Sequence, residues 1–292
     1  MLDYEGLIIR PPSEAESLIL QVTVGCTDNN CIFCPAYKEK QFKIKNISQI
    51  ESEIKSTAEL YPETRRIFLA DGDAIVIPQA QLLTICELLN THFPKLTRIS
   101  VYGSIKSLKT KSVAELSGLK LRKLSLIYMG METGDDEVYK LINKFGSPQG
   151  NIDTCLKIKE PGIKVNSTVI LGLGGIKYSN QHAVNTAAML NKSQPGQIAA
   201  LTLMIVQGTP IFRMQQNNEF VLPDKFGLLK ELLLLLENLD DFRCLFFSNH
   251  ASNYLPINAR FPKDKPEIIN SIKDIINTKN EKALKPEFLR DL

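Results

Sequence analysis

Stretches rich in hydrophobic residues recur along the chain at spacings that suit the strands of a parallel sheet. Six runs consist almost entirely of apolar and β-branched residues, as expected for strands that are covered on both faces. These runs are residues 17–24, 66–70, 98–103, 123–131, 164–172 and 199–206. The intervals between them leave room for a crossover helix after each strand, so the pattern predicts successive βα units.

Apolar residues at three- and four-residue spacing predict helices in these intervals. The predicted helices are residues 48–60, 79–90, 111–116, 135–143, 151–159 and 180–191. Six βα units in a row favour an α/β fold, a partial (βα)6 TIM-like barrel. We expect residues 1–215 to form this barrel core.

The remaining residues, 216–292, are predicted to form a C-terminal helical extension that packs on the barrel. Helical patterns cover residues 224–239 and 265–277. The most apolar run, residues 226–239, contains Lys230, Glu231 and Glu237 and is shorter than the roughly 20 residues that a membrane span needs. The polar start of the chain also lacks the apolar core of a signal peptide. We therefore expect a cytoplasmic protein without a membrane segment.

Composition narrows the choice of partners only a little. The chain has 292 residues, 43% of them hydrophobic, which is enough for a sizeable core. Its net charge of +3 is small, so there is no strong electrostatic attraction to nucleic acid. A small-molecule substrate is the default expectation, with no clear nucleic-acid binding.

Three cysteines lie in the segment VGCTDNNCIFCPAY, directly after the first predicted strand. Cys26, Cys31 and Cys34 are separated by four and then two residues. In parallel α/β sheets, sites are built where strands reach their carboxyl ends, so this is a natural position for chemistry. In a cytosolic protein, clustered cysteines more often bind metal or perform redox chemistry than form disulfides.

The cysteines alone leave three interpretations open. A zinc site needs a fourth ligand, but the nearest histidine is His92, and Cys86, Cys155 and Cys244 are scattered through apolar patterns. The spacing also occurs in plant-type [2Fe–2S] proteins, whose small domain does not explain six βα units. The third possibility is a [4Fe–4S] cluster held by three thiolates, with the fourth iron open to another ligand.

With these residues the chain resembles the radical S-adenosylmethionine (SAM) superfamily. The resemblance implies that Cys26, Cys31 and Cys34 hold a [4Fe–4S] cluster and that SAM binds the fourth iron. An electron from the cluster then cleaves SAM to a 5′-deoxyadenosyl radical. The family's commonest spacing is three and then two residues, so the four residues after Cys26 are a departure. Phe33 occupies the family position whose backbone meets adenine, and Tyr37 is also expected among the cofactor-binding residues.

Further segments match family motifs that bind SAM. LADGDA, after the second strand, stands where the family has a Gly-Gly-Glu-like turn that contacts the amino group of SAM. YMGMETG resembles the Glu-Ser-Gly stretch of coproporphyrinogen-dehydrogenase-like and MiaB-like members, and VNSTVILGLGG resembles the segment beside adenine. The cofactor-binding residues that the resemblance implies here are Asp71, Gly72, Asp73, Glu132, Asn166, Ser167, Leu171, Gly172 and Met204.

The segment RCLFFSNHASNYLP ends an apolar, strand-like run in small hydrogen-bonding residues. Either it is a capped loop, or it is a substrate-facing rim with His250 as a catalytic acid or base. We thus expect a radical SAM enzyme that abstracts hydrogen from a small molecule and receives electrons from a donor such as flavodoxin or ferredoxin. Two alternatives remain: a non-catalytic iron–sulfur or zinc protein, and a radical-SAM-like partner subunit of another enzyme.

Overall fold

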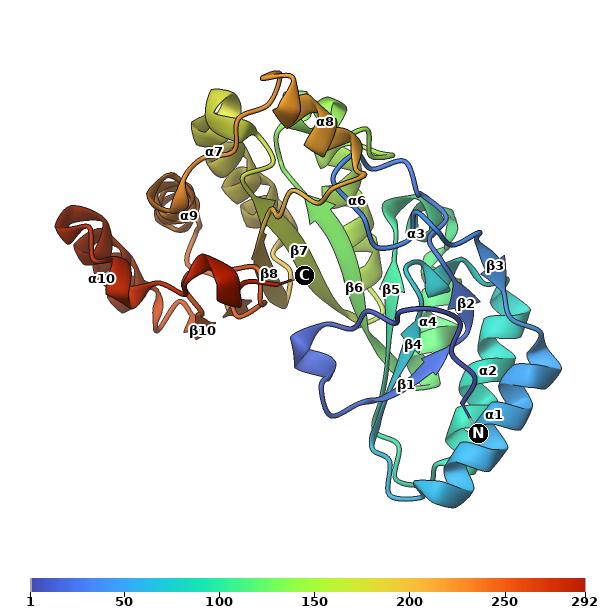
Figure 1. Cartoon of the computed structure of the whole chain (residues 1–292). Helices are drawn as coiled ribbons and strands as arrows, with labels where there is room; N and C mark the ends of the chain where they lie inside the picture. The colour runs from blue at the N-terminus through green and yellow to red at the C-terminus, as the bar shows by residue number, and fades with distance from the viewer. Residues whose placement is uncertain (1, 292) are drawn as a thin grey trace. The chain divides into compact units, whose positions relative to one another are not determined.

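The computed structural model describes residues 2–291, and within them the strands form a mostly parallel eight-stranded sheet (Figure 1). The strand order is β1-β4-β5-β6-β7-β8-β9-β10, and β2 and β3 pair separately. No pairing between described residues closes the sheet into a complete barrel. The α/β class and the open, partial-barrel sheet agree with the prediction from the sequence.

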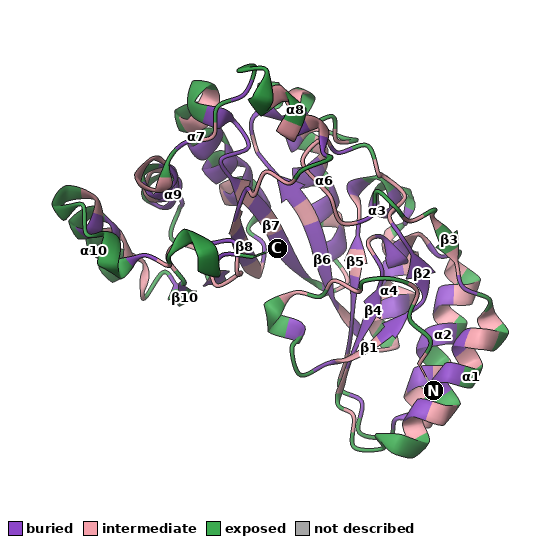
Figure 2. Cartoon of the chain, viewed as in Figure 1, coloured by how far each residue is buried: buried purple, intermediate pink, exposed green. Residues whose placement is uncertain are grey.

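The strands are short and follow the apolar runs of the sequence. Their bounds are β1 Leu18–Gln21, β2 Thr23–Val24, β3 Lys43–Ile44, β4 Arg66–Ala70, β5 Arg98–Gly103, β6 Leu124–Glu132, β7 Lys164–Leu171, β8 Gln197–Thr202, β9 Cys244–Phe247 and β10 Asn258–Phe261. Figure 2 shows that most of their residues are buried.

Helices connect most of these strands. The α-helices are α1 Ile47–Leu60, α2 Gln79–His92, α3 Ile105–Thr110, α4 Val113–Leu121, α5 Asp136–Leu141, α6 Pro148–Lys159, α7 Gly175–Ser193, α8 Pro210–Gln216, α9 Lys225–Asn238 and α10 Lys265–Thr278. Single 3-10 turns are η1 Pro12–Glu14, η2 Ala74–Val76, η3 Glu281–Ala283 and η4 Glu287–Leu289.

The chain divides into two compact units. Unit 1 contains the residues up to Asn29, Ala36–Met129 and Leu156–Val165. Unit 2 contains Asn30–Pro35, Gly130–Cys155 and the residues from Asn166 onward. The boundary that the sequence suggested at residue 215 stays a prediction.

In unit 1 the strands β1, β4 and β5 pair in parallel, and β5 continues the pairing to β6. Successive residues of a strand point to opposite faces, so β4 contributes to two cores. Phe68 packs with Leu126 and Tyr128 on one face, and its ring meets Tyr102 edge-on at a centroid distance of 4.9 Å. Ile67 alternates with these residues and is also fully buried. Helices α1 and α2 pack against each other beside these strands (Figure 1).

In unit 2 the strands β7, β8 and β9 are parallel, whereas β10 returns antiparallel to β9. Helix α9 packs against both α7 and α10 (Figure 1). A separate core gathers Val138 and Ile142 from the α5 region with Leu173, Leu203 and Ile211. This core supports the loops that follow the carboxyl ends of the strands.

The sequence predicted a helical C-terminal extension, but this part of the chain also contains strands. Its strand β9 joins the main sheet beside β8, and the four-residue strand β10 pairs with β9. Helices α3 and α8 were also absent from the prediction. The first predicted strand is divided at Val22, whose N–H donates to the carbonyl of Ala70 at 2.7 Å.

Candidate functional site

The cysteine loop begins immediately after β2. The Cys31 side chain is buried, while Cys26 and Cys34 are half-buried. Cys26 belongs to unit 1, and residues 30–35 belong to unit 2.

In unit 1 the turn after β4 lies directly against the start of the cysteine loop. The Gly72 N–H donates to the carbonyl of Gly25 at 3.1 Å. A Cβ at Gly72 would lie 2.5 Å from the Tyr37 ring and 3.0 Å from the Cβ of Cys26. Only glycine therefore fits where this turn approaches the loop.

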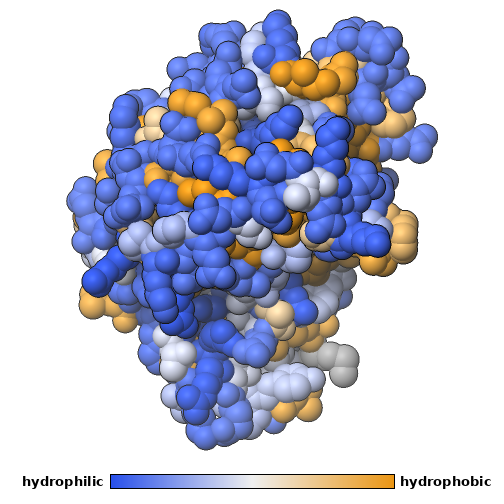
Figure 3. Space-filling view, turned by 90° about the vertical axis from the view of Figure 1, so that its left-hand side faces the viewer, coloured by the Kyte–Doolittle hydropathy of each residue, from blue (hydrophilic) through white to orange (hydrophobic). Residues whose placement is uncertain are grey.

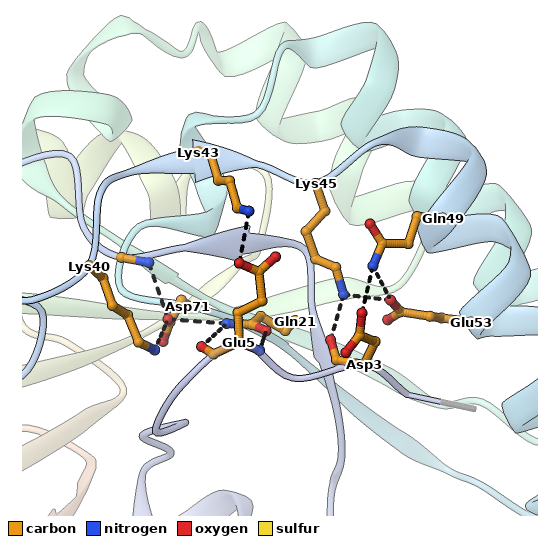
Figure 4. A network of polar contacts seen from close by, with 10 residues as sticks. Asp3, Glu5, Gln21, Lys40, Lys43, Lys45, Gln49, Glu53 and Asp71 are labelled. Carbon is orange, nitrogen blue, oxygen red and sulfur yellow. Dashed lines mark hydrogen bonds and ion pairs between the residues drawn. The ribbon is translucent and has the colours of Figure 1, made fainter.

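Asp71 anchors that turn from a fully buried position. Its Oδ2 accepts hydrogen bonds from Lys40 Nζ at 2.7 Å and from the Gly25 N–H at 3.2 Å, and Gln21 Nε2 lies 3.4 Å away. Figure 4 shows these donors converging on the carboxylate. Burial, followed by the nearby Asp71 carboxylate, raises the pKa of Tyr37, so this side chain is a neutral phenol at physiological pH.

Asp73 joins the turn to two other segments. Its Oδ1 accepts the Ser104 N–H at 2.8 Å, and its Oδ2 accepts hydroxyls of Ser104 at 2.8 Å, Ser107 at 2.6 Å and Thr27. Thr27 directly follows Cys26. The Asp73 carboxylate thus fixes the position of the loop relative to the end of β5, and its contact with a bound amino group stays a prediction.

In unit 2 the second part of the cysteine loop is tied to its surroundings through Ile32. The Ile32 N–H donates to the carbonyl of Ile142 at 3.1 Å, and the Ile32 carbonyl accepts from the Ile211 N–H at 3.2 Å. The side chains of Ile32 and Phe33 pack on the core of unit 2. These contacts fix the backbone directly after Cys31.

Glu132 ends strand β6 with φ +61°, a left-handed conformation that is uncommon for residues other than glycine. Its buried carboxylate accepts a hydrogen bond from Lys144 Nζ at 2.8 Å. The sequence indicated Glu132 but not its partner.

Asn166 and Ser167 are both buried in strand β7, where adjacent side chains point to opposite faces. Asn166 Nδ2 donates to Gln197 Oε1 at 2.9 Å. Asn166 Oδ1 and Ser167 Oγ have no hydrogen-bond partner among the described residues. The strand geometry therefore does not direct these two side chains toward the same ligand.

Leu171 and Gly172 lie at the end of β7, where a buried carboxylate holds the following turn. The Gly172 N–H donates to Glu231 Oε1 at 2.6 Å, and Ser179 Oγ donates to Oε2 of the same residue. Gly172 has φ +87°, which accounts for glycine at this turn. Burial raises the pKa of Glu231, although the nearby His182 opposes the change.

Met204 is half-buried, two residues beyond β8. His250 follows β9, and its Nδ1 accepts from the Ser252 N–H at 3.2 Å and lies 2.9 Å from Ser252 Oγ. Burial, followed by the charge of Lys285, lowers the pKa of His250. The capped-loop interpretation suits this geometry, and a catalytic role for His250 stays a prediction.

Sequence reasoning missed several polar residues of the site. They are Thr27, Lys40, Ser104, Ser107, Lys144 and Glu231. Thr27 directly follows Cys26, and Ser104 directly follows the predicted strand 98–103. These positions could have identified both residues as candidates for the site. Glu231 lies in a helical pattern, where a charged residue ordinarily indicates a solvated face, and Lys144 lies outside the predicted helices and strands.

Within residues 2–291 no three His, Cys, Asp or Glu side chains are grouped as ligands of a single metal ion. In a four-iron cluster each thiolate binds a different iron, so three thiols on one short loop remain a suitable donor set. The absence of a side chain at Gly72 also lets the turn after β4 approach Cys26 closely.

A sequence profile of the radical SAM superfamily matches residues 20–190, which is more than half of the chain. The chain belongs to the radical SAM superfamily. A search of curated protein sequences finds no match. The family places this chain among radical SAM enzymes.

Solved structures of radical SAM proteins share the fold. Coproporphyrinogen III oxidase from Escherichia coli has a TM-score of 0.59 and 19% identity, covering 76% of this chain and 52% of its own. Methylornithine synthase has a TM-score of 0.54 and 15% identity over 76% of this chain and 63% of its own. The cobalamin-dependent enzyme OxsB has a TM-score of 0.62 and 15% identity over 76% of this chain and 41% of its own. The chain thus spans less than two thirds of each of these proteins.

None of the helices described in residues 2–291 has the length and apolar character required to span a bilayer. On the face shown in Figure 3, hydrophobic residues form separate patches among hydrophilic ones.

Proposed function

We propose that this radical SAM protein uses a [4Fe–4S] cluster to cleave SAM and abstract hydrogen from a small-molecule substrate. Cys26, Cys31 and Cys34 would hold the cluster, leaving one iron for SAM. When bound, the cluster supplies an electron that breaks a carbon–sulfur bond of SAM and yields the 5′-deoxyadenosyl radical. An external donor such as flavodoxin or ferredoxin would replace that electron.

The observation that carries the proposal is the close approach of Gly72 to the cysteine loop. Its backbone lies against Tyr37 and Cys26 without space for a side chain. The backbone of this turn therefore lies close to the first cysteine, where an amino group of a ligand bound to the cluster could be held. The resemblance to the Gly-Gly-Glu-like motif of the family also supports a contact between this turn and SAM.

In this proposal, residues around the turn after β4 hold it in position to bind and orient the ligand. Asp71 and Lys40 fix one side of the turn through a buried ion pair, with side chains 0% and 12% exposed. Asp73 fixes the other side through the hydroxyls of Thr27, Ser104 and Ser107. With these groups already bonded, the turn does not have to reorganise when a ligand binds, which favours binding.

The other residues proposed to contact SAM belong to unit 2. We propose Phe33, Leu171, Gly172 and Met204 as neighbours of adenine. Glu132 and only one of the alternating residues Asn166 and Ser167 are proposed as polar contacts. Glu231 holds the Gly172 N–H, so it would position this turn without touching the ligand. His250 is proposed as the acid or base nearest to the substrate.

The decisive experiment compares the reconstituted full chain with cysteine variants under anaerobic conditions. The wild type should bind about four irons and produce 5′-deoxyadenosine from SAM and dithionite. Alanine at Cys26, Cys31 or Cys34 should abolish both the cluster and the product. Cys86→Ala, in helix α2 and fully buried, is the matched control and should retain them.

Two results would overturn the proposal. One is a wild-type chain that takes up no iron under conditions that load other radical SAM proteins. The other is equal iron content in the wild type and in a variant lacking all three loop cysteines. A chain that holds the cluster and SAM but forms no 5′-deoxyadenosine would instead favour a non-catalytic role.

A further inference from the structure

A buried ion pair lies at the end of strand β6 in unit 2. Lys144 Nζ and Glu132 Oε1 are 2.8 Å apart, and the two side chains are only 10% and 8% exposed. Gly130 provides the space for the pair, because a Cβ there would overlap the Glu132 carboxylate and lie 3.2 Å from Lys144 Nζ. Burying two charges is expensive, so their position in the fold requires an explanation.

The pair adjoins the middle cysteine of the loop. Asn143 Nδ2 donates to the carbonyl of the residue before Cys31 at 3.3 Å, and the carbonyl of Ile142 accepts from the residue after it at 3.1 Å. Lys144 is the next residue along the chain. The segment that carries the lysine is therefore anchored to the backbone on both sides of a predicted cluster ligand.

The electrostatics are consistent with this proximity. Burial by itself lowers the pKa of Lys144, but the charges of Glu132 and then Cys31 outweigh it, so that the pKa is raised. Lys144 thus keeps its positive charge at physiological pH. Charges act over longer distances in a buried environment than in water, because they are less screened.

We propose that Lys144 and Glu132 set the reduction potential of the cluster through their charges beside Cys31. Reduction adds one electron, supplied by the external donor, and therefore adds one negative charge to the cluster. The Lys144 cation stabilises the reduced form, and the Glu132 anion opposes it. Both are positioning residues in this respect, since they act through the cluster ligand. This inference rests on the proposed function, which supplies the cluster.

An effect of charge can be distinguished from an effect of structural support, because charge predicts shifts of the midpoint potential in opposite directions for the two single variants. Lys144→Met leaves the Glu132 anion uncompensated, so the midpoint potential should fall. Glu132→Gln leaves the Lys144 cation uncompensated, so the potential should rise. The double variant removes both charges and should lie between the two single variants. A purely structural role gives no reason for opposite shifts.

The measurement is a redox titration of the reconstituted full chain, monitored by the electron paramagnetic resonance signal of the reduced cluster. It is made without SAM, so any contact of Glu132 with SAM does not enter. Each single variant should change the equilibrium constant for reduction by about tenfold, which is about 59 mV for a one-electron couple. Lys140→Met is the matched control, since Lys140 lies nearby in sequence but is 73% exposed, and should cause no shift.

Lys144→Arg keeps the charge and should keep the wild-type potential, which provides a second variant if Lys144→Met holds too little iron. Opposite shifts in the two single variants would establish the inference. Unchanged potentials, or shifts in the same direction, in variants with full iron content would overturn it while leaving the proposed function intact. A wild type without a cluster would refute the proposed function itself.

Discussion

Substitution of Gly72 by alanine tests the contact between the β4 turn and the cysteine loop most directly. The new Cβ would lie 2.5 Å and 2.9 Å from two atoms of the Tyr37 ring and 3.0 Å from Cys26 Cβ. Carbon atoms pack best at about 3.5–4.0 Å. The ring would therefore have to move by about 1 Å, although Tyr37 is buried and surrounded by protein.

The expected cost follows from two opposing effects. Overpacking a well-packed site costs about 1–3 kcal/mol. Gly72 does not have a positive φ, so alanine accepts its backbone conformation and restricts the unfolded chain, which returns about 0.4–1 kcal/mol. The balance is a loss of about 1–2 kcal/mol in the free energy of unfolding. Iron content after reconstitution should also fall, because Cys26 is displaced.

Urea denaturation of the chain without iron, followed by far-ultraviolet circular dichroism, measures the loss. The sequence has no tryptophan, so fluorescence offers little. Gly118→Ala in helix α4 is the matched control, since its nearest neighbour would be Leu83 at an ordinary 3.7 Å. That variant should gain about 1 kcal/mol, as alanine is the better helix former.

A second variant identifies the clash itself. In a Tyr37→Leu background the ring is absent, so Gly72→Ala should cost clearly less than it does in the wild type. The reasoning would be refuted if Gly72→Ala were as stable as the wild type and loaded iron equally. It would also be refuted if the costs of the Gly72 and Tyr37 substitutions simply added.

Two further predictions concern buried charges. Lys40→Met should lower the free energy of unfolding by about 3–5 kcal/mol, because it leaves the fully buried Asp71 without its cation. Adding Asp71→Asn should recover part of this loss in urea denaturation. Losses that simply add in the double variant would contradict the prediction. Burial raises the pKa of Glu231 above its ordinary value of 4.5, so the folded state binds the Glu231 proton more tightly than the unfolded state does. This proton stabilises the folded state fully below about pH 4.5, and the stabilisation is lost as the pH rises through the folded-state pKa. Glu231→Gln should therefore become more stable relative to the wild type as the pH is raised from 4 to 8, and a constant difference would contradict the assignment.

The helices and strands with strong periodicity could be predicted well. Helix α1 was expected from residue 48 and begins at Ile47, where Asn46 caps it. Helix α7 begins at Gly175, five residues before the predicted start. The prediction missed this start because no side chain caps the first turn, so the sequence carries no capping signal there. A hydrogen bond from the Ile176 N–H to the carbonyl of Val221 holds this turn instead. A contact between residues so far apart in sequence leaves no local signal.

The C-terminal strands depended on tertiary context even more strongly. Strand β10 consists of four residues, two of them exposed, and forms by pairing with β9. Such a short run shows little periodicity. The sequence therefore indicated an apolar strand-like run before His250 but not a return strand.

The sequence by itself determined the βα pattern of the chain and the loop of three closely spaced cysteines, Cys26, Cys31 and Cys34, after the first strand. The group that these cysteines hold stays a prediction. Covalent spacing and strand direction are local properties, so both are visible in the amino-acid order.

Only the tertiary structure decided which side chains surround the thiols. Lys144 contacts Glu132 because the segment after α5 brings the lysine to the end of β6, and Gly72 meets Tyr37 because the turn after β4 lies against the cysteine loop. Burial then decides how strongly each charge acts, since an exposed lysine and a lysine in a buried ion pair have the same letter in the sequence.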